Sequence, residues 1–145
     1  MEQFLTTPHA SRARWVVALF AVVAAVAHIP VTGEHLREAP YMGWLFIVLT
    51  VGCLAIAGAA LVRDSSAVYA LAVLTCGLAV VGYAATRLTA FPMLADDVGN
   101  WLEPLGVVSV ITETVVVVAA IVGLRHRARP TSRISTSWPS TVHGG

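Results

Sequence analysis

The sequence predicts an all-α transmembrane four-helix bundle with both termini in the cytoplasm. Hydrophobic residues make up 57% of the 145 residues and charged residues only 12%, whereas charged residues are about 25% of soluble domains. Four apolar runs, at 14–31, 42–62, 67–88 and 105–124, are each close to the ~20 residues that span a bilayer core. We therefore expect a multi-pass protein of the cell membrane, with the lipid bilayer as its main partner.

The arginines set the predicted orientation. The chain has no lysine, and seven of its nine basic residues lie before the first run, between the second and third, or after the fourth. Positive charges favour the cytoplasmic side. Residues 1–13 are therefore expected to be a disordered cytoplasmic N-terminus and residues 125–145 a disordered basic cytoplasmic tail, flanking a transmembrane domain at 14–124. Beyond the arginines of that tail, nothing supports nucleic-acid binding.

The first run has a second interpretation. Two arginines precede an apolar stretch that ends in Ala25, Val26 and Ala27, an arrangement similar to a signal peptide with its cleavage site. Cleavage there would make His28 the N-terminus. We favour a membrane helix because the apolar character continues through Val31.

Polar residues gather in the connection after the first run, residues 28–40. This segment holds His28, Glu34, His35 and Glu38, and Thr32 is expected to cap a short helix that brings the last three side chains to one side. Imidazole and carboxylate groups suit zinc, iron or oxidised copper. We expect these four residues to form an outward-facing transition-metal site, with a solvated interfacial turn as the alternative.

The second and third runs are expected to be antiparallel neighbours, because only the short polar segment 62–66 separates them. Ala21 and Ala25 in the first run and Ala55 and Ala59 in the second have small-xxx-small spacing. That spacing lets transmembrane helices approach closely. The pattern predicts a tightly packed bundle with these alanines between helices.

The second outward connection, residues 88–104, carries three further carboxylates, on Asp96, Asp97 and Glu103. Together with the first connection, it makes the outward face of the protein acidic. Acidic connections of this kind suit either cation binding or the docking of a partner protein.

Glu113 lies in the fourth run, about 12 Å inside the membrane boundary at ~1.5 Å per residue. An ionised carboxylate that faced lipid at that depth would cost several kcal/mol, so Glu113 must face the bundle. Tyr83 and Arg87 lie in the outer half of the third run. We expect these residues and His28 to converge with Glu113 on an intramembrane polar pocket, with Arg87 as a candidate partner of Glu113.

Two strings carry a resemblance. Residues 34–43, Glu-His-Leu-Arg-Glu-Ala-Pro-Tyr-Met-Gly, and residues 96–106, Asp-Asp-Val-Gly-Asn-Trp-Leu-Glu-Pro-Leu-Gly, resemble a group of uncharacterised small four-span membrane proteins of actinobacteria. The resemblance covers most of residues 15–124. It implies the four-span topology and no catalytic role.

Three functions follow from these patterns. The first is binding of a transition-metal cation by the His/carboxylate cluster. The second is a non-catalytic accessory or interaction subunit of a membrane complex, and the third is an oligomeric transporter or proton-coupled protein that uses Glu113. An enzyme is the least supported class, because the chain offers no nucleophile with its base, no phosphate-binding loop and no paired haem ligands.

Overall fold

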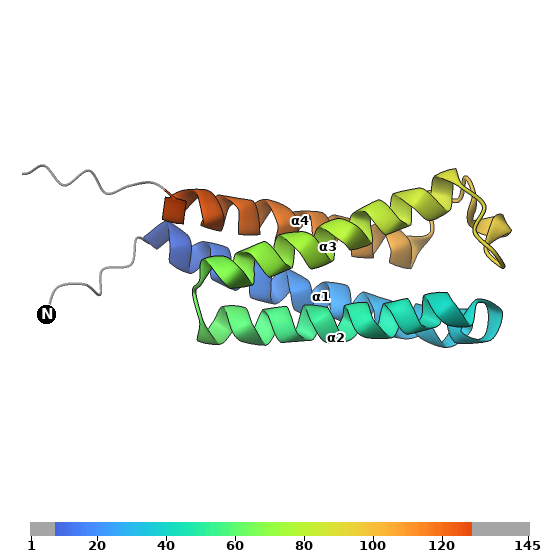
Figure 1. Ribbon diagram of the computed structural model, residues 1–145, viewed down its shortest axis with the longest axis horizontal. Helices are drawn as coiled ribbons and strands as arrows, with labels where there is room; N and C mark the ends of the chain where they lie inside the picture. The colour runs from blue at the N-terminus through green and yellow to red at the C-terminus, as the bar shows by residue number, and fades with distance from the viewer. Residues whose placement is uncertain (1–7, 129–145) are drawn as a thin grey trace, which may run out of the picture.

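A computed structural model describes residues 8–128 of the chain (Figure 1). Its helices are α1 (Pro8–Glu38), α2 (Pro40–Val62), α3 (Ser66–Leu88) and α4 (Pro104–Ala128), and a short 3-10 helix, η1 (Ala95–Asp97), precedes α4. The four α-helices are long and apolar enough to cross a membrane, and residues 8–128 contain no strand. The predicted all-α transmembrane four-helix bundle is confirmed, and the chain is a multi-pass membrane protein.

We name the two ends of the bundle by their connections. The turn end carries residues 63–65, the start of α1 and the end of α4, whereas the loop end carries Ala39 and the connection 89–103 (Figure 1). The side of the membrane that each end faces stays a prediction. α1 begins at Pro8 and α4 ends at Ala128, so the helices extend into the segments 1–13 and 125–145 expected to be disordered. The remainder of those segments lies outside the described residues.

The predicted polar connection at 28–40 is wrong in its local structure, because α1 continues through Pro30 to Glu38. Proline lacks a backbone N–H and usually ends a helix. Here side chains supply further bonds around it, since Thr32 Oγ1 donates to the carbonyl of His28 at 2.7 Å and His35 Nδ1 donates to the carbonyl of Val31 at 2.9 Å. Thr32 therefore lies inside a helix rather than at its cap, and Ala39 alone joins α1 to α2.

The helices follow the order α2, α1, α4, α3 around the bundle. α1 packs extensively on α2 and α4, and α4 packs on α3, whereas α2 and α3 contact each other least. Figure 1 shows α3 diverging from α2 toward the loop end. The short turn between α2 and α3 confirms them as antiparallel neighbours, and they still approach each other near their midpoints, where a Cβ on Gly52 would lie 3.4 Å from Thr75.

The apolar core lies in the turn-end half of the bundle. It is built mainly from small side chains such as Ala21, Ala57 and Ala72, with Ile56 and Val116 among the larger members. Small residues let transmembrane helices approach closely. Of its members, only Ala24 and Ala25 lie on the loop-end side of a helix midpoint, so most of the loop-end half is held together by other contacts.

The prediction that the spaced alanines lie between helices is confirmed for α1 and is wrong for Ala55 of α2. Ala21 and Ala25 of α1 are buried between helices, as expected. Ala55 of α2 is exposed, because the buried side of α2 carries Cys53 and Ile56 instead.

Candidate functional site

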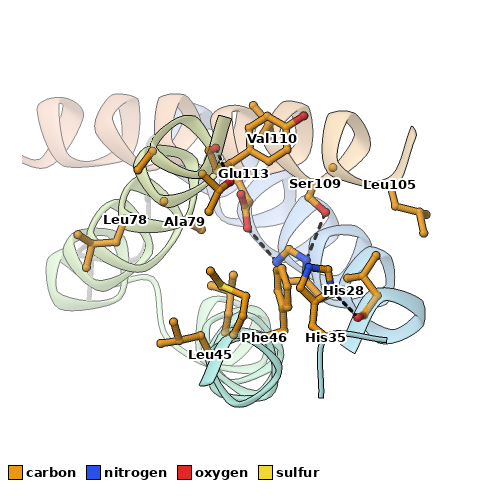
Figure 2. A pocket seen from close by; sticks show the side chains of 18 of the residues that line it. His28, His35, Leu45, Phe46, Leu78, Ala79, Leu105, Ser109, Val110 and Glu113 are labelled. Atoms are coloured by element: carbon orange, nitrogen blue, oxygen red, sulfur yellow. Dashed lines mark hydrogen bonds and ion pairs between the residues drawn. The ribbon is translucent and has the colours of Figure 1, made fainter. Parts of the chain in front are cut away.

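A pocket of about 540 Å³ occupies the loop-end half of the bundle, where α3 diverges from α2. α1 and α4 form its floor, and α2 and α3 form its two sides. Figure 2 shows Leu45 and Phe46 of α2 and Leu78 and Ala79 of α3 around this space, with Glu113 of α4 between them. The volume is in the range of small-molecule sites, about 300–1,000 Å³.

The pocket opens sideways, between α2 and α3. Four side chains that line it, Leu45, Val48, Leu74 and Leu78, are 57–67% exposed. They are apolar and lie within membrane-spanning helices, where the surroundings are lipid. The mouth of the pocket therefore faces the hydrocarbon of the bilayer.

The loop end of the pocket is covered by the connection 89–103. Phe91 lines the pocket from this connection, and Tyr41 Oη of α2 donates to the carbonyl of Pro92 at 2.7 Å. This hydrogen bond crosses from α2 to the connection. The connection thus covers the pocket on the side of the aqueous boundary, while its side mouth stays open.

A buried ionisable pair lies in the wall of the pocket. His28 Nε2 of α1 is 3.0 Å from Glu113 Oε1 of α4, and their side chains are 3% and 2% exposed. Ser109 Oγ lies 3.2 Å from His28 Nδ1 on the other side of the ring (Figure 2). Both ring nitrogens of His28 therefore have partners on α4.

The protonation state decides which group donates in this triad. With a neutral imidazole and an ionised carboxylate, His28 Nε2–H donates to Glu113 and the Ser109 hydroxyl donates to His28 Nδ1. With a protonated imidazole, both ring nitrogens donate, and Ser109 Oγ accepts. The distances are compatible with either state.

A second polar cluster, the Arg87 cluster, consists of Tyr83, Arg87, Asp97 and Glu103. Arg87 Nη1 lies 2.8 Å from Asp97 Oδ1, and Arg87 Nη2 lies 2.8 Å from Glu103 Oε2. The guanidinium carbon is 4.7 Å from the centroid of the Tyr83 ring. The hypothesis that Arg87 pairs with Glu113 is wrong, because Arg87 binds the connection 89–103 while His28 pairs with Glu113.

The structure brings together some of the predicted residues and not others. His28, Tyr83, Arg87 and Glu113 all line the same pocket, together with His35, Asp97 and Glu103. Of the remaining predicted residues, Glu34, Glu38 and Asp96 are exposed and do not line it. Within the part of the chain that the structure describes, no group of three or more His, Cys, Asp or Glu residues is placed to hold a metal ion.

Sequence reasoning missed Ser109 and Phe46. Ser109 is four residues before Glu113, so the two side chains share one side of α4. This four-residue spacing could have predicted that Ser109 lies beside Glu113 in the pocket. Phe46 lies between the two histidines of α1, with its ring centroid 5.4 Å from that of His28 and 4.9 Å from that of His35. Nothing in the apolar run 42–62 distinguished Phe46 from its neighbours.

The fold and the pocket define a small multi-pass membrane protein with an internal, lipid-accessible cavity that contains ionisable groups. Comparisons of the chain with protein-family models, curated proteins and solved structures found no match. The arguments for function below therefore rest on the pocket itself.

Proposed function

We propose that this protein binds a lipid-soluble small molecule in the pocket between α2 and α3, with a polar group of that molecule at His28 and Glu113. The observation that supports this most directly is a buried, ionisable pair in the wall of a cavity whose mouth faces lipid. Ionisable groups at membrane depth are costly and usually functional.

The shape of the pocket supports an elongated ligand. Its α2 side runs from Met42 to Gly52, which corresponds to about 15 Å at ~1.5 Å per residue. Most of the lining is aliphatic or aromatic, whereas His28, Ser109 and Glu113 form a polar patch on the floor. A few placed polar groups in an apolar cavity are typical of sites that orient a ligand.

A photoreactive membrane probe tests this proposal. A long-chain alcohol with a diazirine near its hydroxyl group would be added to the full-length protein in lipid nanodiscs and activated with light. Glu113 is 1% exposed, so a probe reaches its carboxylate only from inside the pocket. We expect Glu113 to be among the labelled residues when peptides are analysed by mass spectrometry.

Two glycines of α3 offer a matched pair of variants. Gly82 lines the pocket and Gly77 does not, and a Cβ at either position would meet no atom within 4 Å. Gly82→Leu should fill part of the pocket and reduce labelling of Glu113, whereas Gly77→Leu should leave labelling unchanged. Labelling confined to exposed lipid-facing residues in the unmodified protein would contradict the proposal.

The transition-metal site at His28, Glu34, His35 and Glu38 stays a prediction, as does the role of an accessory subunit. Elemental mass spectrometry of the purified protein tests the transition-metal site. A stoichiometric copper, zinc or iron that disappears in His35→Ala would support that site. A stable complex with a second membrane protein, isolated in mild detergent, would support the second.

A further inference from the structure

We infer that the occupant of the pocket is a lipophilic organic cation, and that it binds in exchange for one proton of the His28–Glu113 pair. This inference rests on the proposed function and specifies the chemistry of its ligand. The arguments are the charge of the pocket, its aromatic lining and the proton balance at the pair.

The charges that line the pocket favour a cation. Three carboxylates, on Asp97, Glu103 and Glu113, face one guanidinium, on Arg87. Arg87 is held by Asp97 and Glu103 at 2.8 Å each, so it does not neutralise Glu113. Even when the His28–Glu113 pair is neutral overall, Asp97 and Glu103 against Arg87 leave the pocket with a net negative charge, and an anionic ligand would be repelled.

The aromatic residues of the pocket also favour a cationic ligand. Phe46, Tyr83 and Phe91 line the pocket, and the face of an aromatic ring attracts cations because of its quadrupole. Tyr83 already binds a cation in this manner, since the Arg87 guanidinium lies 4.7 Å from its centroid. A quaternary ammonium or phosphonium group would combine this attraction with the charge of Glu113.

Charge balance at the pair predicts the release of a proton. An uncompensated charge is costly in an apolar site, so we expect His28 and Glu113 to share one proton before binding and to be neutral together. A cation that enters next to the pair would leave an uncompensated positive charge in an apolar site, which is costly. Release of the proton to water leaves the cation beside an ionised Glu113 and a neutral His28. One positive charge thus enters the pocket and one leaves it.

Other titratable groups near the pair come from every surrounding element. They are His35 of α1, Cys53 of α2, Cys76, Tyr83 and Arg87 of α3, and Asp97 and Glu103 of the connection 89–103. Of these, Asp97 and Glu103 are both held ionised beside the guanidinium of Arg87 in the Arg87 cluster. The expected proton therefore comes from His28 and Glu113, and binding should tighten as pH rises.

Tetraphenylphosphonium and tetraphenylborate make a direct test, because they have the same shape and opposite charges. Binding of each to the full-length protein in detergent would be measured by equilibrium dialysis at several pH values. We expect tetraphenylphosphonium to bind about tenfold more tightly or better. In weakly buffered solution, its binding should release roughly one proton per cation.

Variants test which residues are responsible for the affinity and for the proton release. Glu113→Gln retains a hydrogen-bonding group toward His28 and should lose both proton release and about tenfold in affinity for tetraphenylphosphonium. Asp64→Asn makes the same carboxylate-to-amide change at the turn end of the bundle, outside the pocket, and should retain both. Gly82→Leu should weaken binding, and its folding is checked by its melting temperature.

The outcomes separate this inference from the proposed function. Equal binding of the two ions, weakened in Gly82→Leu but unaffected by Glu113→Gln, would overturn the cation inference and leave the lipophile-binding pocket standing. Failure of both ions to bind, together with no photolabelling of Glu113, would overturn both.

Discussion

The two ends of the α3–α4 pair are built alike. At the turn end, the ring of Tyr69 packs directly against Gly123. A Cβ added to Gly123 would lie only 2.8 Å from this ring. The Tyr69 hydroxyl donates to Asp64 Oδ1 at 2.7 Å, and Asp64 Oδ1 lies 2.6 Å from Arg127 Nη2. A tyrosine against a glycine is thus combined with an arginine–carboxylate pair.

The loop end repeats this combination with different residues. The ring of Tyr83 packs directly against Gly106, and a Cβ added to Gly106 would lie only 2.5 Å from this ring. The Tyr83 hydroxyl donates to the carbonyl of Trp101 at 3.0 Å. Arg87 pairs with Glu103 beside this ring. α3 and α4 are therefore joined at both ends.

The two ends differ in how α1 and α2 pack against the α3–α4 pair. At the turn end, α1 and α2 complete a core of small residues, and Tyr69 is 1% exposed. At the loop end, α2 is separated from α3, and Tyr83 lines the pocket. The pocket therefore arises from the angle between α2 and α3, because α3 and α4 are in contact at both ends.

The largest expected effect follows from His28→Leu. The His28–Glu113 pair joins α1 to α4 in the half that lacks the alanine core, and the variant leaves a buried carboxylate without its partner. We expect the free energy of unfolding, measured by denaturant titration in detergent, to fall by about 3–5 kcal/mol. Replacing a buried pair by apolar residues is often neutral, so the double variant His28→Leu/Glu113→Leu should recover most of the loss. A double variant as unstable as His28→Leu would show that packing, and not charge, causes the effect.

The two arginine clusters should respond differently to substitution. The Arg87 side chain is 4% exposed and that of Arg127 is 31% exposed. Arg87→Gln should therefore cost about 1.5–3 kcal/mol, as for buried hydrogen bonds to charged groups, and Arg127→Gln less than about 1 kcal/mol. Hydrogen exchange should accelerate in the connection 89–103 for Arg87→Gln only. Equal losses in both variants would mean that the loop end is no more dependent on its ion pairs than the turn end.

Much of the fold followed from physical constraints visible in the sequence. Four apolar runs of bilayer length required four helices, and a polar segment at 62–66 required a short turn. Glu113 had to face the interior because lipid cannot solvate a carboxylate, and it is 1% exposed. These predictions depended on the membrane as a solvent and needed no knowledge of tertiary contacts.

The rest depended on contacts between distant residues. α1 passes through Pro30, which helix-ending rules for soluble proteins do not anticipate but a membrane helix tolerates. Arg87 had carboxylates available on both the connection and α4, and only the three-dimensional structure distinguishes Glu103 from Glu113. The pocket depends on the divergence of α3 from α2, which no local pattern encodes.

Gly123→Ala tests how tightly the turn end is packed. A Cβ there would lie 2.8–3.1 Å from atoms of the Tyr69 ring, and that ring is buried and held through its hydroxyl by Asp64. The ring has no room to move, so the variant should lose about 1–3 kcal/mol of unfolding free energy, as overpacked cores do. Gly58→Ala serves as the control, because a Cβ at Gly58 meets nothing within 4 Å.

Gly106→Ala makes the same change at the loop end and should have the smaller effect. Its Cβ would come within 2.5 Å of the Tyr83 ring, but that ring borders the pocket and can shift into open space. We expect a loss below about 1 kcal/mol, within the range of substitutions that the structure accommodates. The affinity for tetraphenylphosphonium should fall as the ring moves inward. If Gly106→Ala destabilises the protein as much as Gly123→Ala, the Tyr83 wall is rigid, and the pocket is a fixed cavity that admits only ligands of matching shape.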